Sequence, residues 1–169
     1  MSSIEIPDKV NLIGSYAFSE SALVSIDIPE ETLSIPSYLF QNCPKLNSVS
    51  FNGNITQIYS YAFYQCKSLT SFTIPESVRY IGSYVFHSSG LNSIEFPSQI
   101  VSIPTFVCMS CKNLKSVYFK GNVTTIGNRA FSECSILQWA VIPETVTFMD
   151  GDAFSSTDIR NITIPDKIT

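Results

Sequence analysis

The residues of this chain best suited to chemistry are five cysteines and a single histidine. Cys108 and Cys111 are separated by two residues, which is the spacing of dithiol redox motifs and of one half of a zinc site. A redox pair needs a helix N-terminus to lower the thiol pKa, and a zinc site needs a second pair of ligands. The surrounding sequence supplies neither, so we expect no metal, no redox chemistry and no cofactor.

The cysteines follow a regular arrangement that favours a structural role. Four of them stand three residues after a recurring phenylalanine position, at Cys43, Cys66, Cys111 and Cys134. Free cysteine is among the most buried residue types and carries a weak donor, so this pattern predicts a column of buried thiols inside tight turns. A disulfide between neighbouring turns is within distance, although parallel side-chain directions disfavour it.

The histidine has no partner with which to form a catalytic site. His87 follows Phe86 at a position that is otherwise held by Ser, Gln, Tyr or Met, and we expect an exposed imidazole there. No nucleophile or carboxylate lies in register with it, so no triad or acid–base pair can be assembled. We therefore predict that the chain is not an enzyme.

The elements that position these residues are successive copies of one repeat, written L-x-S-I-x-I-P-x-x-V-x-x-I-G-x-Y-A-F-x-x-C-x-x. Repeats begin at residues 1, 23, 46, 69, 91, 114, 137 and 159, and the last is incomplete. Their spacing recurs every 68 residues, which favours duplication of a three-repeat block. Residues 1–169 are thus predicted to form a single solenoid. Because neither end has an atypical capping repeat, we expect a fragment of a longer array, or end-to-end self-association.

Each repeat is predicted to form one short coil of chain. Ile26 and Ile28 alternate with Ser25 and Asp27, which is the period of a half-buried strand, and Pro29 then ends it. A second extended piece follows, and a tight helical or 3₁₀ turn is expected from the Tyr-Ala-Phe stretch, since too few residues remain for an α-helix. The fold class is a right-handed leucine-rich-repeat solenoid with a parallel β-sheet on one face, short extended or 3₁₀ segments on the other, and little or no α-helix.

The repeat resembles the BspA-type leucine-rich repeat, also called the Treponema pallidum type, best over residues 46–66 and 69–86. The resemblance covers essentially the whole chain and implies a non-catalytic protein-binding module of a cell-surface protein, active in adhesion or host recognition. The implied partner is a host-surface or matrix protein. A glycan is a further candidate ligand on the residues alone, since the chain's Trp and Tyr side chains can also stack on sugars. An intracellular structural or scaffolding solenoid, in the cytoplasm, is the alternative.

A binding surface is predicted where an outward strand position departs from its consensus. Trp139 stands where most other repeats have serine, Tyr118 lies one repeat earlier, and Val141 lies two residues along; we call these three the aromatic patch. Exposed aromatic residues with basic residues at the rim are typical of interface centres. The expected basic rim consists of Lys115, Lys120 and Arg160. Alternatively, Trp139 covers neighbouring strands, is buried by a curved face, or contacts a continuation of the chain.

Charge and hydropathy narrow the partners and the location. The net charge of −4 argues against nucleic acid, which is bound by clustered Lys and Arg. No apolar stretch approaches the ~20 residues of a membrane span, and residues 1–7 do not resemble a secretory signal. Glycosylation sequons begin at Asn54, Asn122 and Asn161, so glycans would be carried there in a eukaryotic secretory route. We expect a surface or extracellular location.

Overall fold

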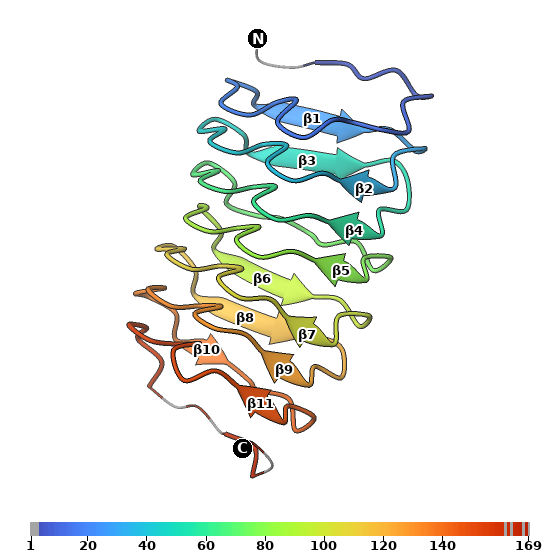
Figure 1. The fold of residues 1–169 in the computed structure, drawn as a ribbon. Helices are drawn as coiled ribbons and strands as arrows, with labels where there is room; N and C mark the ends of the chain where they lie inside the picture. The colour runs from blue at the N-terminus through green and yellow to red at the C-terminus, as the bar shows by residue number, and fades with distance from the viewer. Residues whose placement is uncertain (1–3, 161, 163, 167, 169) are drawn as a thin grey trace.

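The computed structural model describes residues 4–160, 162, 164–166 and 168. Over this range the chain coils into a stack of rungs, one per repeat, in which every strand pair is parallel (Figure 1). No helix occurs among the described residues. The predicted fold class is therefore confirmed, with short extended segments forming the second face.

The wider face of the stack carries the predicted strands. They are β1 (Ser25–Ile28), β3 (Ser48–Phe51), β6 (Ser93–Phe96), β8 (Ser116–Phe119) and β10 (Trp139–Ala140). Equivalent repeat positions face each other, as Ser93 and Ser116 do. In β1 and β6 the second and fourth residues are buried and the other two are exposed, as the alternation predicts. This register places equivalent outward positions in columns across the rungs.

The second face consists of two-residue strands. They are β2 (Ser34–Ile35), β4 (Gln57–Ile58), β5 (Tyr80–Ile81), β7 (Ser102–Ile103), β9 (Thr125–Ile126) and β11 (Phe148–Met149). The second residue of each strand points inward, and the isoleucines at this position are at most 6% exposed. The core is thus closed on two sides by short parallel ladders.

The stretch expected to be helical is instead a run of turns that contain left-handed residues. Among the described residues, every non-glycine with positive φ falls at the tyrosine position of the repeat or four residues later, as Tyr61 (62°) and Gln65 (58°) do. This conformation turns alternate N–H groups toward the next rung, so the Phe63 N–H donates to the Val85 carbonyl at 2.9 Å. A helical turn would direct those donors back into its own segment, and the inter-rung bonds would be lost.

The core between the faces contains a column of stacked phenylalanines. Phe40, Phe63 and Phe86 are fully buried, and their ring centroids lie 5.3 and 5.6 Å apart. Cys108 interrupts the column, and two aromatic residues from the strands stand beside this gap. Phe96 and Phe119 stack at 5.7 Å there. Aromatic packing therefore continues through the stack where the column itself is broken.

Both faces are interrupted at the fourth repeat, at a break that we call the seam. The predicted strand at residues 71–74 is not formed, and β5 does not pair with β7 (Figure 1). We attribute the seam to two features of the fourth repeat. Its inward strand position holds Phe72, where other repeats have Ile, Val or Ala, and the ring packs 4.8 Å from Phe63. The repeat is also one residue shorter than the one before, and its final residue, Gly90, lies where a Cβ would meet the Lys67 carbonyl oxygen at 2.1 Å.

Candidate binding surfaces

The aromatic patch lies on the outer surface of the wider face. Trp139 is 69% exposed, Tyr118 53% and Val141 78%. Trp139 pairs with Ser116, and continuing that register by two residues places Val141 level with Tyr118. The intervening Ala140 is buried, so Trp139 and Val141 both point outward. The alternative in which a curved face buries Trp139 is therefore wrong.

The basic residues predicted at the rim do not all lie beside the aromatic patch in the same way. The Lys115 carbonyl accepts hydrogen bonds from the N–H groups of Gln138 (3.1 Å) and Trp139 (3.3 Å), and Lys115 is exposed beside the patch. Arg160 is exposed on the next rung, and its guanidinium lies 3.6 Å from the Asp158 carboxylate. The structure thus brings Lys115 next to Trp139 and places Arg160 in an ion pair with Asp158.

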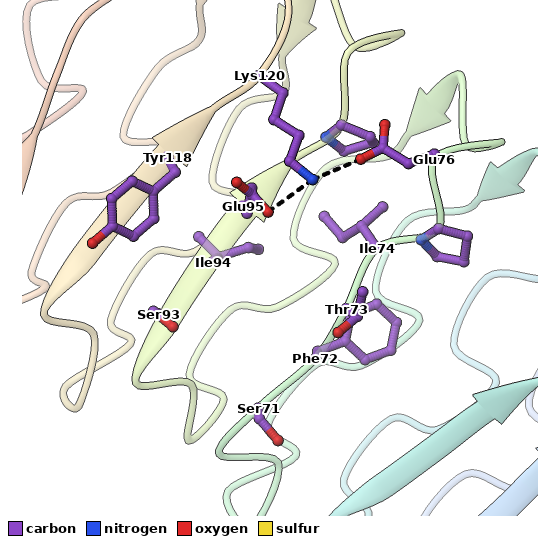
Figure 2. A pocket seen from close by; sticks show the side chains of 12 residues that line it. Ser71, Phe72, Thr73, Ile74, Glu76, Ser93, Ile94, Glu95, Tyr118 and Lys120 are labelled. Atoms are coloured by element: carbon purple, nitrogen blue, oxygen red, sulfur yellow. Dashed lines mark hydrogen bonds and ion pairs between the residues drawn. The ribbon is translucent and has the colours of Figure 1, made fainter.

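Lys120 lies two residues after Tyr118 on the same rung, and its side chain is directed toward the seam (Figure 2). Its ammonium bridges the carboxylates of Glu76 at 2.8 Å and Glu95 at 3.0 Å, as Figure 2 shows. The Ser98 N–H also donates to Glu76 at 3.4 Å. Hydrogen bonding to Lys120 lowers the pKa of Glu76, and the two carboxylates raise the pKa of Lys120, so both shifts favour the charged form of their group.

The Lys120 bridge borders a cavity of about 580 Å³ that opens at the seam. Hydroxyl side chains of Ser71, Thr73 and Ser93 line it, together with the Tyr118 ring (Figure 2). The sequence singled out Lys120 as part of the expected basic rim, but it did not point to Glu76 or Glu95. The signal that could have found them is the repeat register, which places the three residues on consecutive rungs at the same end of the strands.

The four cysteines at equivalent positions form the column that their spacing predicts. Each thiol donates to the main-chain carbonyl of the residue at the phenylalanine position one rung earlier. These pairs are Cys43 to Phe18 (2.9 Å), Cys66 to Phe40 (3.0 Å), Cys111 to Phe86 (2.9 Å) and Cys134 to Cys108 (3.1 Å). All five cysteines are buried free thiols, and the described residues contain no group of three or more side chains able to hold a metal ion. The column fastens each turn to the one before it.

We expect these thiols to be unreactive in the folded protein. Burial raises the pKa of Cys43, Cys66 and Cys134, so at about pH 8 they carry little thiolate, which is the reactive form. Against the effect of burial, hydrogen bonding to Cys108 and Ser89 lowers the pKa of Cys111, but its side chain is fully buried and out of reach of a reagent. Iodoacetamide should leave the native chain unmodified, and mass spectrometry should show all five sites alkylated in denaturant. Rapid alkylation of the native protein would contradict the column.

His87 is half-buried rather than exposed as predicted, because aromatic residues of its own and neighbouring turns surround it. The ring lies edge-on to Tyr64 at 5.0 Å, and Nδ1 is 2.7 Å from the Met109 carbonyl oxygen. That carbonyl can only accept, so Nδ1 carries the proton. Because Nδ1 is protonated, it cannot accept a hydrogen bond from the Ser88 hydroxyl, which lies 3.2 Å away.

A second aromatic feature follows the turn edge and received no role from the sequence. The rings of five residues at the tyrosine position stack at 4.5 to 4.7 Å, with interplanar angles of at most 12°. They are Tyr16, Tyr38, Tyr61, Tyr84 and Phe106. Desolvation and the neighbouring tyrosines raise the pKa of Tyr61. Such stacking offsets part of the strain of left-handed aromatic residues, so we assign the column to stability.

Two further predictions concern the surface as a whole. Asn54 and Asn122, which begin the first two sequons, are exposed in equivalent turns, whereas Asn161 lies outside the described residues. Among the residues that the structure describes, no helix is long and apolar enough to cross a membrane. Neither observation assigns the chain to a compartment.

Comparison with known proteins gives a consistent result. The family model described as the BspA type leucine-rich repeat region matches in six copies, over residues 1–115 and 56–169. No curated protein matches the chain. A solved leucine-rich repeat protein from Bacteroides ovatus is similar over 99% of this chain, with a TM-score of 0.81 and 23% identity. One from Eubacterium ventriosum is similar over 92%, with a TM-score of 0.81 and 25% identity.

The leucine-rich repeat protein of T. pallidum is similar over 82% of this chain, with a TM-score of 0.76 and 25% identity. The chain covers 52% of the Bacteroides protein, 42% of the Eubacterium protein and 68% of the T. pallidum protein. It thus spans about half the length of the first of these structures.

Proposed function

Since the chain belongs to the family of BspA-type leucine-rich repeat proteins, we propose that it is a non-catalytic protein-binding module of a cell-surface protein, acting in adhesion or host recognition. The rigid stack holds outward side chains in fixed columns, and partner proteins would dock on the wider face. The expected partner is a host-surface or matrix protein.

The observation that carries this proposal is the exposure of the aromatic patch. Tryptophan and tyrosine are enriched among the residues that dominate binding energy, and a tryptophan 69% exposed on a regular strand has no role in the core. Trp139 replaces a residue that is serine at Ser25, Ser48 and Ser93, and the stack does not need the larger side chain. The proposal is therefore supported by a replacement of serine by tryptophan that the fold does not require.

An intracellular scaffold is the second candidate, and the free thiols favour it. Unpaired cysteines are typical of reducing compartments, and all five are free here. Their burial would also protect them outside the cell.

Labelling of intact source cells with a membrane-impermeant amine-reactive biotin separates the candidates. Lys45, Lys67, Lys112 and Lys115 are exposed, so the folded chain can be labelled without proteolysis. We expect biotin on these lysines before lysis, with a cytoplasmic protein of the same cells unlabelled as the control. Labelling that appears only after lysis would rule out the surface role and leave the scaffold.

A further inference from the structure

The cavity at the seam is produced by the repeat architecture. It lies between residues 71–76 of the fourth rung and strand β6 of the fifth. A second cavity, of about 400 Å³, lies between the first and second rungs, where Asp8, Asp27 and Asn52 stand 68 residues before Glu76, Glu95 and Lys120. In both places the first rung of the pair is a 22-residue repeat, and strand pairing is absent between the two rungs over the residues described. The recurrence associates the depression with the 22-residue repeat.

The chemistry of the seam cavity differs from that of its copy. Lys120 stands at the position that Asn52 occupies 68 residues earlier, so an ammonium group takes the place of an amide. Tyr118 likewise stands at the position of Ser50. These two changes add an aromatic ring to the wall and a cation that holds two carboxylates in place. The remaining lining groups include hydroxyls, which both donate and accept hydrogen bonds.

The charges of the seam cavity disfavour charged ligands. An anion would meet the carboxylates of Glu76 and Glu95, and the one cation among the described lining residues, Lys120, is already bound to both of them. A cationic ligand would have to displace that intramolecular ammonium, which lies at 2.8 and 3.0 Å from its partners. A neutral ligand with several hydroxyls meets neither obstacle.

The backbone adds further hydrogen-bonding groups on both sides of the cavity. Residues 70–98 are all described, and in this range the Asn92 N–H donates to the Thr70 carbonyl at 3.0 Å before the ladder ends. No backbone hydrogen bond then joins 71–75 to 93–97. Polar main-chain groups that would normally pair between strands therefore remain available to a ligand or to water.

We propose that the seam cavity is a binding site for a neutral sugar. The apolar face of the sugar ring lies against Tyr118, and its hydroxyls bind the carboxylates of Glu76 and Glu95, the Ser and Thr hydroxyls and the unpaired backbone. A volume of about 580 Å³ is in the range of small-molecule sites, with room for a sugar unit. Tyr118 belongs both to this site and to the aromatic patch, but Trp139 does not line the cavity, so a Trp139 variant separates this inference from the proposed protein partner.

The test uses methyl glycosides of glucose, galactose, mannose and N-acetylglucosamine, with N-acetylneuraminic acid and glucosamine as charged probes. Saturation-transfer NMR and titration should show at least one neutral glycoside binding in about the millimolar range, and both charged probes about tenfold more weakly. Glu95→Gln and Lys120→Asn should each weaken the neutral glycoside about tenfold. These side chains are roughly half exposed, so thermal unfolding should be unchanged in both variants.

Two matched variants complete the design. Glu30→Gln changes an exposed glutamate at the repeat position of Glu76, on a rung outside the cavity, and should bind the glycoside like the wild type. Trp139→Ser should also keep glycoside binding, which separates this site from the protein-binding proposal. The proposal is overturned if no neutral glycoside binds, if a charged probe binds more tightly, or if Glu95→Gln and Lys120→Asn both bind like the wild type.

Discussion

Phe63→Ala is expected to lower the free energy of unfolding by roughly 3–5 kcal/mol, the largest stability effect that we predict for a single residue. Phe63 is fully buried, and its ring contacts three others: Phe40 at 5.3 Å, Phe86 at 5.6 Å and Phe72 at 4.8 Å. Truncation leaves a cavity in the centre of the stack that neighbouring rungs cannot close, because their strands and turns are fixed by ladders on either side. Core packing in a repeat stack joins mainly adjacent rungs, so the defect weakens the coupling between the two halves of the solenoid.

Urea unfolding followed by circular dichroism measures this effect, with Phe148→Ala as the matched control. Phe148 is the same residue type but is 49% exposed on the second face, so its truncation should cost less than about 1 kcal/mol. Equal losses in the two variants would contradict the stacked column. A loss below about 1 kcal/mol for Phe63→Ala would contradict it as well.

Much of this fold could be predicted because the same pattern of apolar and polar residues recurs in every repeat. The alternation of Ile26 and Ile28 with Ser25 and Asp27 fixes which strand side faces the core, and the constant spacing fixes the register between rungs. The cysteine column followed from the same spacing. These features depend on periodicity alone, which a single sequence displays fully.

The conformation of the turns and the position of the seam could not be predicted. They depend on tertiary contacts that select among several local backbone conformations, and the sequence pattern does not show these contacts. Tyr61 is not a residue that favours positive φ, and it adopts this conformation because the inter-rung hydrogen bonds require it. The loss of the strand at 71–74 depends on how Phe72 packs against Phe63 and Phe86, which the spacing does not state. Tertiary contacts override local preference in both places.

The candidate surface was predicted in part for a similar reason. Exposure of Trp139, Tyr118 and Val141 follows from strand alternation, so the sequence could place these three. The direction of a long charged side chain does not follow from it. Lys120 reaches across a rung to Glu76, which is 44 residues away, and this bridge becomes visible only when the rungs are stacked.

A double variant of the aromatic patch is expected to have the largest effect on binding. Trp139→Ser with Tyr118→Ser removes both rings, and each ring is a candidate for the energetic centre of an interface. If the proposed partner docks here, its affinity should fall by roughly a hundredfold or more. Stability should change little because both residues are more than half exposed, and serine is the residue that most repeats carry at the Trp139 position.

The measurement that tests the central claim most directly is binding of the labelled chain to cultured epithelial cells and to an immobilised extracellular-matrix preparation. Tyr80→Ser is the control, since Tyr80 is 47% exposed on the other face of the stack. We predict that the wild type and Tyr80→Ser bind alike, and that the double variant loses nearly all binding. A double variant that binds like the wild type would remove the aromatic patch as the binding surface, and a wild type that binds neither target would contradict the adhesion role.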